Sequence, residues 1–193
     1  MSAPPKHRQA IIDAAVTLFR QKGYAATGLN DIVELSGAPK GSLYHYFPQG
    51  KAAIGEAAVR EAGRRVAETV EALSVSAKSA GELVKAHARL LAGWMAESGY
   101  RDGSPVTTVL LENAPADAGI TAAGLQALGD WRRIVARRLV EDGFSAGRAE
   151  RLALLATAAL DGALVRARVE QSGAPLLAAA EELDALLRTT PRD

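Results

Sequence analysis

The sequence predicts an all-α fold, in which a three-helix helix-turn-helix head is joined to a larger helical body, with about nine helices in total. Composition supports this prediction: alanine and leucine dominate, 48% of the 193 residues are hydrophobic, and only 5% are aromatic. Residues of this kind favour helices over strands. Apolar residues also recur every three or four positions along most of the chain, and glycine or proline interrupts them where helices are expected to end.

Composition also excludes several kinds of site. The chain has no cysteine, which rules out disulfides, thiolate metal sites and a cysteine nucleophile. The histidines His7, His45 and His87 do not have the spacing of a metal site, and we expect neither a metal nor a cofactor. No uncharged apolar run reaches the roughly 18 residues of a membrane span, and the first residues lead into an amphipathic segment. The sequence therefore predicts a cytoplasmic protein without a membrane partner.

Charge is distributed unevenly along the chain. Residues 1–51 contain six Lys or Arg against three acids, a net charge of +3, whereas the remaining residues contain 17 against 19, a net charge of −2. A basic head on a mildly acidic body is typical of a DNA-binding module joined to a domain of another kind. Together with the helix pattern described next, this charge difference favours a helix-turn-helix DNA-binding domain over residues 1–50 and a second domain over residues 51–193, which we expect to be joined without a flexible linker.

The head begins with a helix predicted over residues 6–22, where apolar residues share one face and Gly23 follows as a stop signal. Thr27 offers a hydroxyl that can cap a second helix of about two turns. A third helix is predicted over residues 39–46, because the fixed φ of Pro39 suits the first helical position. Two short helices joined by a glycine-containing turn make a helix-turn-helix, and the first helix covers its apolar side.

The predicted third helix has two different faces. Leu43, Tyr46 and Phe47 lie together by i+3 and i+4 spacing, and we expect them to pack on the first two helices. The other face carries short or polar residues: Lys40, Gly41, Ser42, Tyr44 and His45. Such a face suits the DNA major groove, with Gly41 permitting close approach of the backbone. The alternative is a solvated face on a small bundle, where an exposed Tyr44 has little purpose.

Lys51 stands where the fourth helix is expected to begin. A cation at a helix N-terminus opposes the helix dipole, so stability alone favours an acid at this position. A DNA phosphate docked at this helix end removes the conflict, because the ammonium and the backbone N–H groups then face the same anion. The hydroxyl of Thr27 either reaches a second phosphate or serves as a cap alone.

Residues 8–55 resemble the N-terminal domain of the TetR/AcrR family of transcriptional repressors. The resemblance rests on an ordered series of segments: Arg-Gln-Ala-Ile-Ile-Asp-Ala-Ala-Val-Thr-Leu-Phe, Gly-Tyr-Ala-Ala-Thr, Asp-Ile-Val, Lys-Gly-Ser-Leu-Tyr-His-Tyr-Phe, and then Lys51. The stretch 37–48 is similar to the LmrA/YxaF-like branch. By position the resemblance implies DNA contacts at Thr27, Lys40, Gly41, Ser42, Tyr44, His45 and Lys51. Pro39 departs from the family pattern, since many members place a capping Ser or Thr there.

Six further helices are predicted in the body, over residues 51–73, 82–97, 105–113, 121–142 and 146–171, and from residue 176 onward. We expect a mostly apolar cavity among them with a few polar or aromatic groups around it: Trp94, Tyr100, Glu112, Asn113, Trp131 and Asp161. His87 falls within an apolar stripe, and we expect a core residue there. Asp161 interrupts an apolar helix and needs a partner. We expect a structural partner, Arg166 or an arginine of another helix, and the alternative is a ligand.

Four arginines crowd one face of the helix predicted over residues 121–142: Arg132, Arg133, Arg137 and Arg138. Their number invites a second nucleic-acid site. The family resemblance places this helix far from the DNA-binding head, however, and solvated basic faces are common on helices. We therefore interpret these arginines as a solvated face.

The last two predicted helices offer a self-complementary apolar patch, which a two-fold dimer through a four-helix bundle covers most simply. The predicted interface comprises Leu155, Ala159, Gly162, Ala163, Arg166, Leu176, Ala180, Leu183 and Leu187. The family resemblance implies the same homodimer. Its two heads then meet two half-sites of a palindromic operator, roughly 34 to 36 Å apart or a multiple of that distance.

The predicted function is that of a DNA-binding transcriptional regulator, a repressor. The resemblance implies release from double-stranded operator DNA when a small hydrophobic inducer fills the ligand-binding and dimerisation domain. One alternative is an enzyme of the same helical build, but no nucleophile elbow, phosphate loop, metal cluster or acid pair supports it, and we expect no enzymatic activity. Another is a helical small-molecule-binding adaptor that does not act through DNA, and a third is a ligand-free scaffold or adaptor that binds protein through its head. Steep salt dependence of DNA binding would distinguish the regulator from the adaptor.

Overall fold

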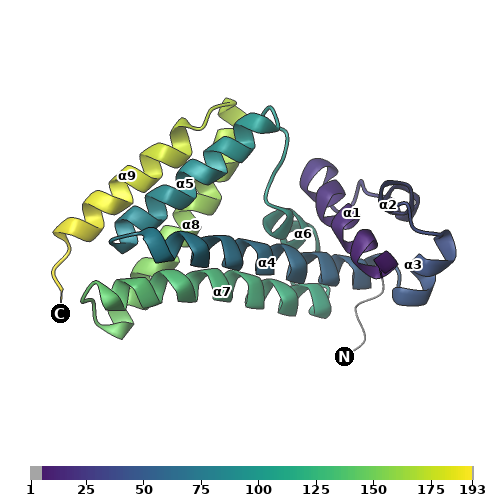
Figure 1. Ribbon diagram of the computed structural model, residues 1–193, viewed down its shortest axis with the longest axis horizontal. Coiled ribbons are helices and arrows are strands. Elements are labelled where there is room, and N and C mark those ends of the chain that lie inside the picture. Colours follow the sequence, from purple (N-terminus) through teal and green to yellow (C-terminus); the bar gives the residue numbers. More distant parts are fainter. Residues whose placement is uncertain (1–5, 193) are drawn as a thin grey trace. The chain divides into compact units, whose positions relative to one another are not determined.

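A computed structural model describes residues 6–192, which form nine α-helices and no strand (Figure 1). Residues 1–5 and 193, which belong to the two predicted domains, lie outside the described residues. The helices are α1 (Lys6–Lys22), α2 (Leu29–Ser36), α3 (Lys40–Tyr46), α4 (Lys51–Ser76), α5 (Ala80–Glu97), α6 (Pro105–Asn113), α7 (Ala118–Glu141), α8 (Ala146–Glu170) and α9 (Ala174–Thr189). The all-α class predicted from the sequence is confirmed.

Side-chain caps fix the starts of three helices, α5, α6 and α7. Helix α6 begins where predicted, because the Ser104 hydroxyl accepts a hydrogen bond from Thr107 N at 3.1 Å and a proline occupies the first turn. Helices α5 and α7 begin earlier than predicted. The Ser79 hydroxyl caps α5, and the Asp117 carboxylate accepts a hydrogen bond from Ile120 N at 2.9 Å at the start of α7. The apolar pattern alone does not mark these capped first turns.

Contacts divide the chain into two compact units. Unit 1 contains the residues up to Arg64 together with 104–127, and unit 2 contains 65–103 together with the residues from Leu128 onward. The sequence places a boundary near residue 50 instead, and that division stays a prediction. Helix α6 belongs to unit 1 because its buried valines share one apolar cluster with α1. A helix predicted for the body thus packs with the head.

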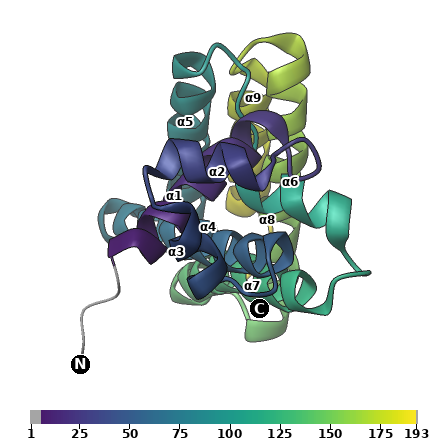
Figure 2. The same ribbon diagram turned by 90° about the vertical axis from the view of Figure 1, so that its right-hand side faces the viewer.

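The core of unit 1 is formed where α1, α2 and α3 meet the first part of α4 (Figure 2). Phe19 of α1 is fully buried, and its ring centre lies 5.2 Å from that of Tyr24. Leu43 and Phe47 are buried in the same cluster, and Tyr46 packs against it. The inward face predicted for the third helix is therefore confirmed, and burial of this apolar area stabilises the head.

The core of unit 2 is built by α5, α7, α8 and α9, with α9 packed on α5 and α8. Asp184 of α9 is only 3% exposed, and its carboxylate forms ion pairs with Lys85 and Arg188, each at 2.7 Å. A Cβ added at Gly81 would collide with the Asp184 side chain. Glycine at this position thus lets α5 pack closely against Asp184. The ion pairs with Lys85 and Arg188 compensate the cost of burying the Asp184 carboxylate.

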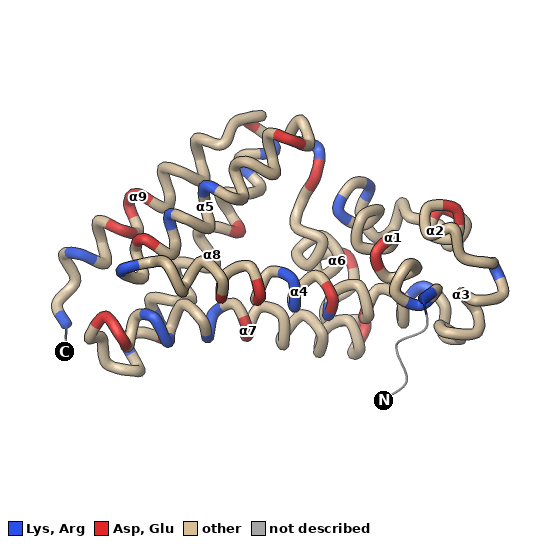
Figure 3. Tube along the Cα trace, viewed as in Figure 1, with Lys and Arg blue, Asp and Glu red and all other residues tan. Residues whose placement is uncertain are grey.

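The arginines of α7 are each paired with an acid: Arg132 with Glu150, Arg133 with Asp130, Arg137 with Glu71, and Arg138 with Asp142. Both oxygens of the Glu71 carboxylate accept hydrogen bonds from the Arg137 guanidinium, at 2.7 and 2.8 Å, and this bond raises the pKa of Arg137. Figure 3 marks the charged residues along the chain. Because the acids neutralise this face, it attracts a DNA phosphate less than four free arginines would.

Candidate nucleic-acid interface

Helix α3 presents to solvent the face that the sequence predicts for DNA. Lys40, Gly41, Tyr44 and His45 are exposed, and Tyr44 is 51% exposed although its neighbour Leu43 is fully buried. Ser42 is half-buried at the edge of the same face. Because Leu43 anchors the helix, the lysine, tyrosine and histidine side chains on the other side remain available for a partner.

A tight turn fixes the direction of α3. Gly37 ends α2 with φ +63°, in the left-handed region that glycine adopts at little cost, and its N–H donates to Glu34 O. The Ser36 hydroxyl accepts a hydrogen bond from Ala38 N at 3.2 Å, and Ala38 is buried. Pro39 then stands at the N-cap of α3 without a side-chain cap bond. The turn itself, rather than a capping hydroxyl, therefore positions α3.

The capping role predicted for Thr27 is wrong. Gly28 is the N-cap of α2, and the Asp31 carboxylate accepts a hydrogen bond from Gly28 N at 3.1 Å. That bond, followed by the contact with Lys22, lowers the pKa of Asp31. Thr27 is 1% exposed, and its hydroxyl donates to Gly23 O at 2.7 Å. Because its only proton is used inside the turn, this hydroxyl cannot also donate to a phosphate.

Lys51 is the first residue of α4, as predicted. Its Nζ donates to Ala25 O at 3.2 Å and lies 4.4 Å from the centre of the Tyr24 ring. Burial lowers the pKa of Lys51, and the nearby Glu112 carboxylate opposes this shift. The ammonium group has three donors and uses one for Ala25, so two remain for an anion at this helix end.

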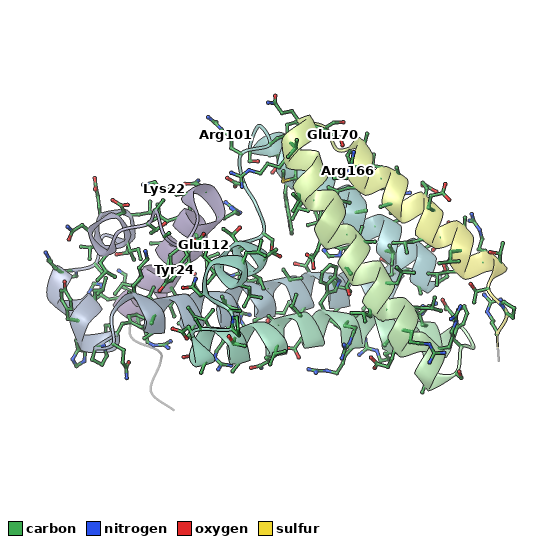
Figure 4. The ribbon with its side chains drawn as sticks, turned by 180° about the vertical axis from the view of Figure 1, so that it is seen from behind. Lys22, Tyr24, Arg101, Glu112, Arg166 and Glu170 are labelled. Atoms are coloured by element: carbon green, nitrogen blue, oxygen red, sulfur yellow. The ribbon has the colours of Figure 1, made fainter. Side chains whose placement is uncertain are left out.

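The Glu112 carboxylate, which the sequence predicts beside a ligand, binds the backbone of the turn before α2. Its Oε1 accepts a hydrogen bond from Tyr24 N at 2.9 Å, and its Oε2 accepts one from Ala25 N at 2.6 Å (Figure 4). The partners are 88 and 87 positions apart in sequence. Neither composition nor periodicity indicates such a contact, which arises because α6 packs against α1.

Four other residues that the sequence predicts around a ligand have other surroundings in the structure. The Asn113 amide donates to Val109 O of its own helix at 2.8 Å, and Trp94 is 43% exposed. Tyr100 has φ +60° and packs, half-buried, against the core of unit 2. The half-buried Asp161 has no hydrogen bond or ion pair with any described residue, and burial raises its pKa to about 6. The partner suggested for it, Arg166, binds another residue of α8 instead.

A narrow cavity lies inside unit 2, and in this structure it has no room for a water molecule. Its lining consists of Val70, Leu83, Val84, His87, Trp131, Val135, Ala156, Thr157 and Leu160. All of these are apolar except His87, Trp131 and Thr157. Trp131 alone of the six predicted ligand residues lines it. Its indole Nε1 is buried and has no acceptor in the described structure. A larger groove between α7 and α8 is open to solvent and lined partly by paired charges, so it encloses a ligand poorly.

His87 lines this cavity, which the sequence did not predict, although the expected burial in the core is confirmed. The imidazole is 3% exposed and meets the Trp131 ring edge to face, with 5.2 Å between ring centres. Burial lowers the pKa of His87 to about 4. The ring is therefore neutral at pH 7 and can donate one hydrogen bond and accept another.

The predicted dimer face requires correction. Five of its residues are buried inside the core of unit 2: Ala163, Leu176, Ala180, Leu183 and Leu187. The cause is that α9 turns its apolar face toward α5 and α8 of the same chain. Leu155, Gly162 and Arg166 are exposed and Ala159 is half-buried. The outer surface also exposes large apolar residues that were not predicted: Leu154, Val165 and Val169 of α8, and Leu177 and Leu186 of α9.

An exposed recognition helix anchored by a small three-helix core defines a helix-turn-helix DNA-binding protein. The family of bacterial regulatory proteins named tetR matches residues 11–58. The C-terminal domain of LmrA/YxaF-like transcriptional regulators matches residues 80–182. The chain therefore belongs to the TetR family of transcriptional regulators, in its LmrA/YxaF-like branch.

Individual relatives are similar to this chain over most of its length. The HTH-type transcriptional regulator YxaF of Bacillus subtilis is 31% identical over 188 residues, which cover 97% of this chain and 98% of YxaF. A TetR regulatory protein structure from Rhodobacter sphaeroides is 26% identical with a TM-score of 0.80, covering 94% of this chain and 98% of that one. A structure of the TetR family regulator CifR with 26 bp double-strand operator DNA has the same fold at 22% identity, with a TM-score of 0.76 and coverage of 99% and 100%.

These comparisons place the protein among DNA-binding transcriptional regulators rather than enzymes. Within residues 6–192, no helix is long and apolar enough to span a membrane.

Proposed function

We propose that this protein is a homodimeric cytoplasmic repressor that binds a palindromic operator and is released by a small hydrophobic ligand. The outward face of α3 carries the proposal, because exposed Tyr44, His45 and Lys40 surround a helix fixed by the fully buried Leu43. Side chains held on a rigid helix in this way can enter a major groove without further ordering.

Two kinds of DNA contact follow from this arrangement. Contacts to the major groove come from Lys40, Gly41, Ser42, Tyr44 and His45. Contacts to a phosphate come from Lys51 and from the N–H groups at the start of α4, where the helix dipole favours an anion. Thr27 has a different part, since its buried hydroxyl closes the turn before α2.

The dimer forms through the outer face of α8 with part of α9. Leu154, Val165 and Val169 are exposed at 54%, 55% and 77%, and they lie on one side of α8 by helical spacing. Ala158 and Gly162 lie between them and are exposed too, so a second helix can approach closely. Exposure of such an apolar stripe to water is unfavourable. In a two-fold dimer, the stripe of each subunit covers that of the other.

We assign an uncharged ligand to the cavity of unit 2, which has no room for a water molecule in this structure and must widen to admit a ligand. Its lining contains no acid, lysine or arginine, so a charged ligand would lose its hydration without compensation. The unpaired Trp131 Nε1–H and the neutral His87 ring offer a hydrogen bond to a ligand acceptor. A ligand that enters must therefore separate helices that line the cavity, among them α5, α7 and α8.

A reporter assay tests repression. The DNA upstream of the gene is fused to a reporter in cells that carry or lack the protein. Repression predicts that expression rises when the protein is absent and when it carries Tyr44→Ala. Expression that falls or stays unchanged contradicts a repressor.

Release is tested on a fluorescent operator complex titrated with uncharged apolar compounds. Trp131→Phe removes the indole N–H and retains most of the ring, while Trp94→Phe is the matched control at an exposed position. Compounds that release the wild type through this cavity should require higher concentrations for Trp131→Phe and the usual concentration for Trp94→Phe. Equal effects on both variants contradict the assigned cavity.

A further inference from the structure

The turn between α1 and α2 is held by a carboxylate that lies far away in sequence. Glu112 stands near the end of α6, and its two oxygens accept hydrogen bonds from the consecutive N–H groups of Tyr24 and Ala25, at 2.9 and 2.6 Å (Figure 4). Bonds from backbone N–H groups to a charged oxygen are stronger than neutral ones. Both N–H groups lie outside the helices, so no helical carbonyl takes the place of the carboxylate.

The backbone of the turn is shaped for this anion. Gly23 has φ +86°, a left-handed conformation that lets the next two N–H groups point to the same side. A Cβ added at Gly23 would stand 2.8 Å from Glu112 Oε1. Gly23 therefore meets two requirements, one of conformation and one of space. On the other side, the buried Thr27 hydroxyl closes the turn on Gly23 O.

A cation holds the same two residues from another helix. Lys51 at the start of α4 donates to Ala25 O and lies over the Tyr24 ring. The turn is thus clamped between an anion of α6 and a cation of α4, and the clamp consists of Glu112, Lys51 and the Tyr24–Ala25 backbone. Helix α2 starts directly after this turn and leads into α3, so the position of the turn affects the position of the DNA-contacting face.

We propose that Glu112 is a positioning residue for operator binding: its carboxylate ties the helix-turn-helix to α6 and thereby sets how the operator half-sites must be spaced. A purely local stabiliser would change how much protein is folded but not which operator it prefers. The proposal rests on the two-headed operator binding proposed above.

Glu112→Gln is the direct test. The amide retains one acceptor oxygen but directs an NH₂ group at the second backbone N–H, which loses its bond. Glu97→Gln is the matched control, because it removes the same charge at an exposed position and so corrects for weaker repulsion of DNA. Affinity is measured for the native operator and for operators whose half-sites are moved apart or together by one and two base pairs.

The expected result is that Glu112→Gln binds the native operator about tenfold more weakly than Glu97→Gln, while the altered spacings lose less, so that the preference for native spacing falls. Equal spacing preference in the two variants would overturn the proposal, whatever their overall affinities. A wild type without any spacing preference would instead contradict two-headed binding.

Amide hydrogen exchange tests the clamp without DNA. The Tyr24 and Ala25 amides should exchange at least several times faster in Glu112→Gln than in Glu97→Gln, because they lose their acceptor. Unchanged exchange at both amides would show that the carboxylate does not hold the turn, and this result would overturn the proposal even if operator binding is weaker.

Discussion

The Lys51 ammonium group lies 4.4 Å from the centre of the Tyr24 ring, so a cation at the start of α4 is held against the turn before α2. One donor of this ammonium binds Ala25 O. The group is thereby oriented at a helix N-terminus while retaining two donors. A phosphate can bind to these donors and to the nearby backbone N–H groups.

Replacing Lys51 by Met should weaken operator binding and reduce its salt dependence. The plot of log K against log[salt] has a negative slope, and the loss of one phosphate contact makes it shallower by about 0.9. The slope is measured by fluorescence anisotropy at several salt concentrations. Lys78→Met, which removes a positive charge from an exposed residue of unit 2, is the control. A slope equal to that of the control would mean that Lys51 only supports the turn.

Replacing Leu43 by Ala should lower the free energy of unfolding of the head. Leu43 is fully buried, so truncation leaves a cavity in the core of unit 1, and the expected loss of stability is about 2–5 kcal/mol. Urea denaturation measures this loss, and Tyr44→Ala on the opposite face is the control, for which about 0.5 kcal/mol or less is expected. Similar losses for both variants would contradict the two-faced description of α3.

Introducing a charge on the outer face of α8 should dissociate the dimer. Leu154→Glu and Val165→Glu place carboxylates in the apolar stripe, where two-fold symmetry would bring them together without a counter-charge. Sedimentation should show a monomer for each and a dimer for Val75→Glu, a control at a residue that is 86% exposed. If both α8 variants remain dimeric, another surface forms the dimer.

Acidification should destabilise the protein through His87. Its folded-state pKa of about 4 lies below the value of about 6.5 expected for an unfolded chain, so the folded state binds fewer protons. The corresponding stability is fully present above pH 6.5 and is lost as the pH falls toward 4, by about 3 kcal/mol in total.

His87→Gln should therefore lose less stability than the wild type between pH 6.5 and 4, as measured by urea denaturation at each pH. His7→Gln, at an exposed histidine of α1, should behave like the wild type. Asp161 has the opposite effect on stability. Its pKa is raised to about 6 in the folded state, so the folded state binds more protons and becomes relatively more stable as the pH falls below 6. The wild type, His87→Gln and His7→Gln are therefore also compared with Asp161→Asn added to each. Parallel pH curves for all three proteins would contradict the assignment to His87.

The sequence predicts those features that depend on local pattern. The nine helices and the inward position of Leu43 follow from helical spacing, and α6 is predicted to the residue because Ser104-Pro105 encodes its cap. The start of α2 is predicted wrongly, because Thr27 resembles a cap in sequence but is buried, while Gly28 and Asp31 cap the helix.

Features that depend on tertiary packing are not predictable in this way. Leu183 has the spacing of a dimer residue, yet the same spacing suits packing against α5 within one chain. The contact of Glu112 with Tyr24 joins residues 88 positions apart, and nothing near either residue indicates it. His87 is predicted as a core residue, but only the packing of Trp131 beside it reveals a cavity with an unpaired donor, the Trp131 Nε1–H.

The central claim is that the outward face of α3 binds DNA, and operator affinity of Tyr44→Ala and Lys40→Ala tests it most directly. Affinity for the DNA upstream of the gene is measured by fluorescence anisotropy, with Val75→Ala as the control for an exposed residue outside the head. We predict that each α3 variant binds about 10- to 100-fold more weakly than the control while remaining as stable. Wild-type affinity in both α3 variants would contradict the account.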